Sequence, residues 1–454
     1  MPCLRFAATL ASAVALLAGT LSRADAQTVP DFSAVDALIQ DSLALIGGGA
    51  VVRVVRADTV VFERAYGTFA TGEAVEIASA TKWMSGAVVL SLVDSGHLSL
   101  DDPLSRFFPD LTGPKRAITV RQLFSHTSGI VEVPVGSCLT ERTTTLAACA
   151  AEVLARPLRF TPGTGFFYAG GSMHVAGRVA EIASGRPWAT LFAERVARPL
   201  GMTDTAYLSA TNPWIGGGLV STAADYTALL QMVLTGGLHR GQRVLSEASV
   251  AAMLADQTGV EAGATPVLFS PFSRYAGTDP DLPADVLGYG IGVWREQLTE
   301  AGGLRHASSP GAYGFSPWVD VERRLAGALV VLDDGPDVLP TYLELKRRLA
   351  AALDGAVTAS ESGPASPTPV SVRPLFPNPA AGDATVPFRL AASGQVRLEA
   401  FDALGRRVAV LVDAVLPAGD HAATVDTRAL PAGVYVLRLT AGHDTVTARL
   451  TTAR

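Results

Sequence analysis

The chain has 454 residues and a formal net charge of −6, with 48% hydrophobic and 17% charged residues. Because a single hydrophobic core rarely grows past ~250–300 residues, this length favours at least two domains. The apolar content excludes an intrinsically disordered protein, and the mild acidity differs from the basic surface of a nucleic-acid binder.

The first 26 residues predict a secretory signal peptide. Arg5 supplies a positive charge, residues 6–18 form a short apolar segment, and Ala24-Asp25-Ala26 is typical of a cleavage site. The apolar segment is too short to cross a bilayer. We therefore expect an exported chain that begins at residue 27 and is secreted or displayed at the cell surface.

Composition changes sharply at residues 356–371, which are small, polar and proline-rich and predict a linker. This linker separates a large domain at 27–355 from a tail at 372–454. In the large domain, strand patterns at both ends enclose a helix-rich middle, which predicts an α+β fold whose antiparallel sheet is closed by the two ends of the domain. The tail contains only strand and turn patterns, which predict a small all-β sandwich.

In chain order, the large domain is expected to open with strands at 51–56, 60–66 and 75–78 and a helix at 81–95. Further helices are predicted at 146–155, 172–184, 188–197, 223–234 and 246–255. Three strands and a last helix are predicted at 290–295, 314–319, 326–332 and 340–353. The tail strands are predicted at 396–401, 407–412, 422–425, 434–439 and 444–450.

Cys138 and Cys149 form an even pair around a short polar stretch, in a chain that is expected to meet an oxidising environment. A bridge between them would stabilise the fold by roughly 2–3 kcal/mol. The alternative is two buried free thiols. We predict a structural disulfide, because neither cysteine has the nearby His and Asn of a catalytic thiol.

Several enzyme classes lack their signature in this chain. Only three basic residues are lysines and none follows a glycine, so there is no P-loop. There is no CxxC or HExxH pattern for a metal and no GxSxG nucleophile elbow. We expect chemistry that uses no metal, cofactor or nucleic acid.

Ser79 and Lys82 lie one turn apart at the start of the helix predicted at 81–95. A serine hydroxyl becomes a nucleophile when a base takes its proton, and a partly desolvated lysine can do so. The free N–H groups of a helix N-terminus can also stabilise an oxyanion. In the alternative interpretation Ser79 caps the helix and Lys82 is a solvated helix residue. The pattern therefore needs partners elsewhere in the chain.

Two later segments offer such partners. Tyr168 precedes the helix at 172–184, where its hydroxyl could share the proton transfer with Lys82; alternatively, it is a core aromatic residue. Further along, the small residues of His306-Ala307-Ser308-Ser309-Pro310-Gly311 would let that backbone approach a substrate.

These motifs, in this order, resemble those of the serine β-lactamase and penicillin-binding protein superfamily. They are most similar to class C β-lactamases and family VIII carboxylesterases, and the resemblance spans about residues 30–350. Further similar stretches are His126-Thr127-Ser128-Gly129, Pro199-Leu200-Gly201-Met202, Gly216-Gly217-Gly218 and Tyr289-Gly290-Ile291-Gly292. The resemblance implies a β-lactamase/transpeptidase-like fold, with Ser79 as the acylated nucleophile and Lys82 and Tyr168 as a proton relay. It also implies an oxyanion hole formed by the backbone amides of Ser79 and Ser309.

The sequence departs from the family's β-lactamases where those enzymes hold their substrate. Gly170 replaces an asparagine, and His306-Ala307-Ser308 replaces Lys-Thr-Gly. The site has therefore lost polar groups that hold an anionic amide. We assign Gly170, His306 and Ser308 to the substrate pocket and predict a carboxylesterase rather than a β-lactamase. His126 is interpreted as a hydrogen-bonded loop residue, since Lys82 already fills the role of base.

The tail resembles type IX secretion C-terminal sorting domains of Bacteroidota-type bacteria. The motifs are Pro377-Asn378-Pro379, Phe401-Asp402, Gly405-Arg406-Arg407, Pro417-Ala418-Gly419 and the stretch at 430–435. The resemblance implies that secretion machinery recognises the tail, carries the chain across the outer membrane and removes the tail. The alternative is a fibronectin-like or carbohydrate-binding accessory sandwich.

The sequence thus predicts an exported serine hydrolase that cleaves a small ester or amide through an acyl-enzyme. Within the enzyme class, the alternatives are a β-lactamase and a D-amino-acid peptidase with penicillin-binding activity. A different class, a sensor that is acylated once without turnover, stays open as well. The Gly/Pro-rich stretch at 257–285 is expected to line the pocket.

Overall fold

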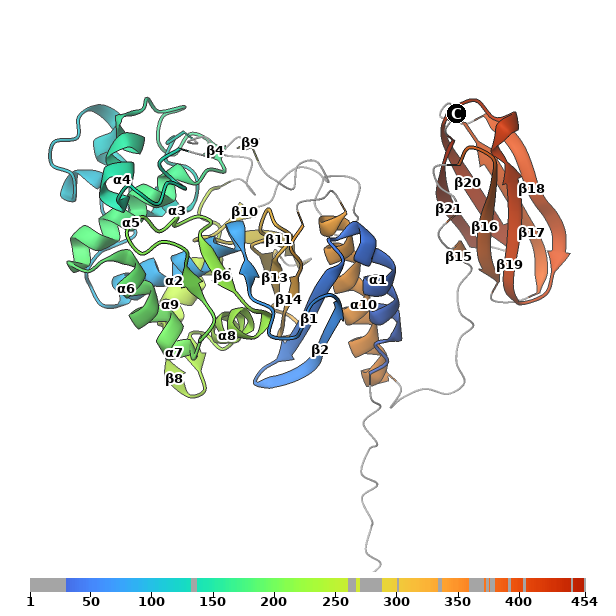
Figure 1. Cartoon of the computed structure of the whole chain (residues 1–454), viewed down its shortest axis with the longest axis horizontal. Coiled ribbons are helices and arrows are strands. Elements are labelled where there is room, and N and C mark those ends of the chain that lie inside the picture. Colours follow the sequence, from blue (N-terminus) through green and yellow to red (C-terminus); the bar gives the residue numbers. More distant parts are fainter. Residues whose placement is uncertain are drawn as a thin grey trace, which may run out of the picture. The chain divides into compact units, whose positions relative to one another are not determined.

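The chain divides between Ala356 and Val357 into two compact units, shown in a computed structural model in Figure 1. The described residues are 30–131, 137–259, 267–269, 288–299, 302–333, 337–358, 371–372, 375, 380–390, 393–402, 406–441 and 444–452. The predicted signal peptide, most of the linker, most of 257–285 and the tail motifs at 377–379 and Gly405 lie outside them.

A seven-stranded antiparallel sheet forms the centre of the large unit, in the order β10-β11-β12-β13-β14-β1-β2. β1 (Gly49–Arg56) lies between β2 (Thr59–Gly67) and β14 (Leu325–Val330), with Val51 opposite Val330. The two ends of the domain therefore close the sheet, as the sequence predicts. The remaining strands are β10 (Gly288–Tyr289), β11 (Trp294–Leu298), β12 (Leu304–Ser308) and β13 (Ser316–Asp320).

Both faces of this sheet are covered, because side chains of a strand alternate between its faces. Val51 and Val55 of β1 belong to the core shared with α2 (Thr81–Asp94) and α8 (Ala223–Leu234). The intervening side chains of β1 belong to a second core with α1 (Ser33–Ser42) and α10 (Val338–Thr358). Figure 1 shows α1 and α10 together on one side of the sheet and α8 on the other.

The segment between β2 and β10 forms the helical region beside the sheet. Its other helices are α3 (Val120–Phe124), α4 (Leu146–Ala155), α5 (Gly171–Ser184), α6 (Trp188–Phe192), α7 (Arg198–Leu200) and α9 (Glu247–Leu254). Its short strands are β3 (Val75–Glu76), β4 (Phe166–Phe167), β5 (Ala206–Tyr207), β6 (Leu219–Ser221), β7 (Leu238–His239), β8 (Gln242–Arg243) and β9 (Val267–Phe269). Within the described ranges, no helix is long and apolar enough to cross a membrane.

The predicted secondary structure differs from the structure at a few places. The predicted strand at 290–295 is wrong: the chain turns after β10, and β11 begins only at Trp294. Gly292 has a φ of +80°, which is incompatible with an extended strand. The helix predicted at 188–197 ends at Phe192 and continues as a π turn. The sequence patterns did not predict α1, α3 or β12.

The tail forms the predicted sandwich of two antiparallel sheets. One sheet contains β15 (Ser371–Val372), β16 (Asp383–Leu390) and β19 (Gly419–Asp426). The other is ordered β18 (Arg407–Leu416), β17 (Gly394–Phe401), β20 (Gly433–Ala441) and β21 (Asp444–Thr452). A separate apolar core fills the space between them, which includes Phe388, Leu398 and Leu437.

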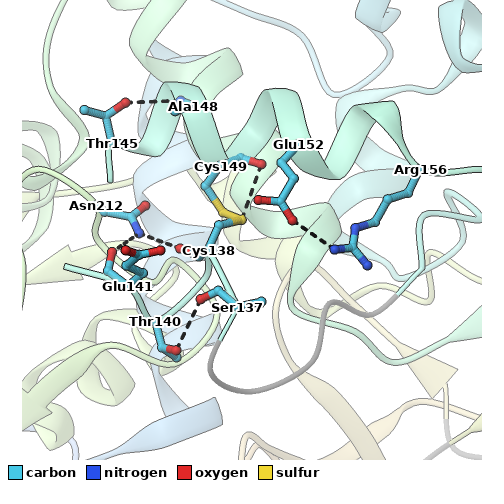
Figure 2. Close-up of a disulfide and its surroundings, with 10 residues drawn as sticks. All are labelled: Ser137, Cys138, Thr140, Glu141, Thr145, Ala148, Cys149, Glu152, Arg156 and Asn212. Carbon is cyan, nitrogen blue, oxygen red and sulfur yellow. Dashed lines mark hydrogen bonds and ion pairs between the residues drawn. A yellow bond between two sulfur atoms is a disulfide. The ribbon is translucent and has the colours of Figure 1, made fainter. Parts of the chain in front are cut away.

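The predicted disulfide between Cys138 and Cys149 is confirmed, with the two Cα atoms 5.3 Å apart (Figure 2). It ties the loop before α4 to the first turns of that helix. Asn212 supports the same loop, since its Nδ2 donates to the carbonyl oxygens of Cys138 and Glu141, both at 2.7 Å. The alternative of two free thiols does not apply.

We expect the Cys138→Ser/Cys149→Ser double variant to lose roughly 2–3 kcal/mol of unfolding free energy, because its unfolded chain is no longer restricted by the loop. Urea denaturation of both proteins measures this difference. An Asn212→Ala variant that keeps the bridge separates the effect of the covalent link from that of loop hydrogen bonds. A double variant that unfolds at the wild-type urea concentration would contradict the expectation.

Candidate active site

Ser79 lies in the 3₁₀ turn Ala78–Ala80, which leads directly into α2. Hydrogen bonds from distant segments hold this turn. The Tyr226 hydroxyl donates to the Ala80 carbonyl at 2.7 Å, and the Ser309 hydroxyl donates to the Ser79 carbonyl at 3.2 Å. Ala78 has a φ of +41°, a conformation that side-chain-bearing residues rarely adopt. Such strain persists only where the surrounding contacts impose it, as they do here.

Lys82 is 3% exposed and lies against Ser79. Its Nζ is 2.9 Å from Ser79 Oγ and 2.7 Å from the carbonyl oxygen of Gly216. The alternative in which Lys82 is a solvated helix residue is therefore wrong. Ser79 does not cap α2 either, since no side-chain cap is present at that helix. The partly buried Ser79 hydroxyl and the buried Lys82 amine instead form a pair within hydrogen-bond distance.

Tyr168 follows β4 and precedes α5, and its ring lies beside Lys82. The ring centroid is 4.7 Å from Lys82 Nζ, and the ring stacks on Trp294 at a centroid distance of 5.1 Å. Tyr168 is only partly buried, so it borders the site rather than filling the core. Ser79, Lys82 and Tyr168 come from separate parts of the sequence, and the fold brings them together.

Two glycines allow other backbone segments to lie directly against this turn. A Cβ on Gly292 would lie 2.2 Å from the Lys82 carbonyl oxygen, and one on Gly311 would lie 2.2 Å from the Ile77 carbonyl oxygen. Real Cβ atoms do not approach that closely, so only glycine fits at either place without movement. The turn that carries Ser79 is thus enclosed between the loop before β11 and the loop after β12.

The assignment of His306 and Ser308 to the substrate pocket is wrong. Ser308 is fully buried and its hydroxyl donates to Glu296, which also binds α10 through Lys346. His306 Nε2 lies 3.1 Å from Asp320 Oδ2 in a cavity on the α10 face of the sheet. Burial would raise the pKa of Asp320, but hydrogen bonds from His306 and Arg323 outweigh it and lower the pKa to about 2.

Two residues further along the chain, Ser309 and Gly311, instead approach the turn Ala78–Ala80, here called the nucleophile turn after the expected role of Ser79. This displacement also corrects the predicted oxyanion hole. The backbone N–H of Ser309 donates to the Pro317 carbonyl at 3.3 Å, so it is engaged within the sheet. Ser309 contacts the nucleophile turn through its hydroxyl and not through its amide.

Gly170 lies with its Cα next to Gly216, whose carbonyl oxygen binds Lys82 Nζ. Three contributors were not predicted as site residues: the Gly216 carbonyl, the Tyr226 hydroxyl and the Trp294 ring. Gly216 belongs to the glycine triplet that resembles the family, so the sequence could have indicated it as a site residue. Tyr226 and Trp294 resemble ordinary core aromatic residues in the sequence, and only the fold reveals their contacts.

Burial at the site shifts the pKa values of His126 and Tyr226 so that both side chains are neutral. His126 is 2% exposed, and burial together with the positive charge of Lys82 holds its pKa well below the usual 6.5. Burial likewise raises the pKa of the Tyr226 hydroxyl well above 10, so that it acts as a hydrogen-bond donor. Within the part of the chain that the structure describes, no group of three His, Cys, Asp or Glu side chains is placed to hold a metal.

A model of the beta-lactamase family matches residues 35–352, well over half of the chain. The chain belongs to the beta-lactamase family. Residues 374–452 match the model of the secretion system C-terminal sorting domain, which confirms the resemblance of the tail over the accessory-sandwich alternative. The predicted β-lactamase/transpeptidase-like fold is confirmed as well.

Similar proteins place this beta-lactamase-family chain among serine hydrolases. An uncharacterized protein of Mycobacterium tuberculosis is 31% identical over 299 residues, which cover 52% of this chain and 72% of that protein. Lovastatin esterase of Penicillium rubens is 28% identical over 316 residues, covering 55% and 77%. A solved Bacteroides dorei structure, provisionally named a beta-lactamase, has 32% identity and a TM-score of 0.63, covering 72% of this chain and 99% of that one.

We expect Gly292→Ala to lower both stability and Ser79 reactivity, because the added Cβ would displace the Lys82 carbonyl. Gly302→Ala is the matched control: Gly302 has nearly the same φ, +81°, but nothing within 4 Å of an added Cβ. The control should lose only the ~1–2 kcal/mol of left-handed strain. Urea unfolding and the rate of fluorophosphonate labelling measure the two effects. Equal losses in both variants would show that the contact with Lys82 is unimportant.

Proposed function

We propose that this chain is an exported carboxylesterase that forms an acyl-enzyme on Ser79. The observation that carries the proposal is the buried Lys82 amine, 2.9 Å from Ser79 Oγ and next to the Tyr168 ring. This arrangement provides a nucleophile with a proton acceptor within hydrogen-bond reach. Lovastatin esterase and Esterase EstB, the latter 31% identical over 188 residues, are relatives named for ester cleavage and support this choice.

In the proposed reaction, Ser79 Oγ attacks the ester carbonyl while its proton passes to the Lys82/Tyr168 pair. The bond between the acyl carbon and the alcohol oxygen then breaks, and the alcohol leaves with that proton. Water attacks the acyl-enzyme by the same route, which releases the acid and returns the proton to Ser79. We treat Lys82 and Tyr168 as one unit, because Lys82 Nζ lies 4.7 Å from the centroid of the Tyr168 ring.

The proposed oxyanion hole combines the backbone amides of Ser79 and Ala312. Ser79 lies at the helix N-terminus, where N–H groups lack partners within the helix. Ala312 directly follows Gly311, which lies against the nucleophile turn. Ala312 is exposed, and its N–H donates no hydrogen bond to any described residue. This amide replaces that of Ser309, which is bound to Pro317.

An ester fits this site better than a β-lactam or a peptide. Gly170 lies beside Gly216, and Ser309 and Gly311 lie against the nucleophile turn; none of these three residues carries an amide or ammonium side chain. An anionic substrate whose carboxylate is desolvated without a partner would bind poorly. A neutral ester needs no such partner, because its carbonyl oxygen is held by the backbone amides alone.

The sorting domain indicates type IX secretion to the cell surface or the extracellular space. We propose that residues 1–26 direct the first export step and that secretion machinery then recognises and removes the tail. A β-sandwich with its own core supports this role, since it can be recognised apart from the enzyme. The substrate would then be an ester that is available outside the cell.

We expect the full chain to hydrolyse short p-nitrophenyl esters and to leave a chromogenic cephalosporin nearly untouched. Ser79→Ala should abolish turnover, and Tyr168→Phe should lower kcat by about 10²-fold, the usual contribution of general acid–base catalysis. Rapid cephalosporin cleavage would favour a β-lactamase instead. Single fluorophosphonate labelling of Ser79 without turnover of either substrate would favour a sensor or a peptidase.

Ala312→Pro should lower kcat for the same ester by about 10²-fold, because the variant lacks one oxyanion donor. Ala312→Gly keeps the N–H and should retain most of the activity. Unfolding midpoints of both variants check that the loop after β12 is intact. Wild-type activity in a folded Ala312→Pro protein would exclude this amide from the oxyanion hole.

A further inference from the structure

His126 contacts the backbone on both sides of Tyr168. Its carbonyl oxygen accepts a hydrogen bond from the Phe167 N–H at 2.9 Å, and its Nδ1 accepts one from the Ala169 N–H at 3.3 Å. The imidazole also packs on the Tyr168 ring, with centroids 4.6 Å apart. One residue thus accepts hydrogen bonds from the residue on each side of Tyr168 and also packs on the tyrosine ring.

The Tyr168 ring also stacks on Trp294, with ring centroids 5.1 Å apart. The tyrosine therefore contacts both an imidazole and an indole, with Lys82 Nζ 4.7 Å from the ring centroid. Packing on Trp294 is apolar and lets the tyrosine ring slide. The hydrogen bonds that His126 accepts from the Phe167 and Ala169 amides instead fix the backbone that carries Tyr168. Of these two neighbours, His126 is the one that specifies where the tyrosine lies.

The backbone of His126 adopts a φ of +60°, in the left-handed region that few non-glycine residues occupy, although Asn, Asp and His do so more often than others. The neighbouring backbone supports it: the Thr127 N–H donates to the Gln122 carbonyl at 3.2 Å, and the Ser125 N–H donates to the Arg121 carbonyl at 2.9 Å. Strained conformations of this kind are retained where the side chain has a specific use.

The hydrogen bonds of the His126 imidazole agree with a role in holding the neighbouring backbone. Because Nδ1 accepts the Ala169 N–H, the proton of the neutral ring is on Nε2. Nε2 is buried and has no hydrogen-bond partner among the described residues, and the Tyr289 ring lies 4.8 Å away. The Nε2–H therefore has no acceptor among the described residues, and Nδ1 is the ring nitrogen that accepts a hydrogen bond.

We propose that His126 is a positioning residue that holds Tyr168 at the distance from Lys82 and Ser79 that proton transfer requires. This proposal rests on the proposed function of Tyr168 and deepens it. His126 does not touch the substrate or exchange a proton; it acts on the reaction only through the placement of the tyrosine. A displacement of about 1 Å at a reacting group can cost about 10²-fold in rate, so a residue of this kind affects kcat more than KM.

A matched pair of variants tests the hydrogen bond without adding backbone strain. Both Gly and Asn tolerate a positive φ, but only Asn carries an oxygen close to the position of Nδ1 that can accept the Ala169 N–H. We expect His126→Gly to lower kcat for a p-nitrophenyl ester by 10- to 100-fold with little change in KM. His126→Asn should recover a large part of that loss. Unfolding midpoints of both variants exclude misfolding as the cause.

A double-variant cycle separates positioning from a merely structural role. If His126 acts through the Tyr168 hydroxyl, His126→Gly should cost little further activity once Tyr168→Phe is present. A loss of the same factor in both backgrounds would overturn the proposal, as would wild-type kcat in His126→Gly. If Tyr168→Phe alone keeps full activity, the proposed relay fails, and this outcome is distinct from a failure of His126.

Discussion

The rest of the site depends on the burial of the Lys82 side chain. An amine that is removed from water requires partners, and here Ser79 Oγ, the Gly216 carbonyl and the Tyr168 ring provide them. These partners come from the 3₁₀ turn before α2, from the segment before β6 and from the loop after β4. Separate segments of the helical region therefore have to be assembled before the lysine can meet its neighbours. The geometry of the proposed active site and the stability of the fold are linked through this one side chain.

The nucleophile turn combines strain with close support. Ala78 and His126 both adopt left-handed backbone conformations, and both lie within hydrogen-bonded loops at the site. Gly292 and Gly311 let two other backbone segments contact the turn directly. Because so many contacts restrict the same few residues, the turn cannot relax without disrupting its neighbours. A site restricted in this way needs little reorganisation during the reaction. Such preorganisation of hydrogen-bond donors and dipoles is the usual source of electrostatic catalysis.

The far face of the sheet has a polar network of its own. Glu296 accepts hydrogen bonds from Ser308, Tyr342 and Lys346, and it is 1% exposed. Burial alone would raise the pKa of Glu296, but Lys346 and these hydrogen bonds keep it below its usual value. A buried charge pair of this kind adds little net stability, yet removing one partner is costly. The network attaches β12 to α10 and so supports the strand that leads to Ser309 and Gly311.

The sequence by itself determined the two-domain organisation, the α+β class, the disulfide and the order of motifs around Ser79, Lys82 and Tyr168. These features depend on composition and local patterns that a single chain displays directly. Only the tertiary structure decided which residues after Leu304 meet the nucleophile. Side chains alternate along a strand, so an error of three positions moves a residue to the other face. His306 therefore lies beside α10, while Ser309 reaches the Ser79 carbonyl. The two hydrogen bonds that His126 accepts from the segment around Tyr168 likewise exist only because the fold brings distant loops together.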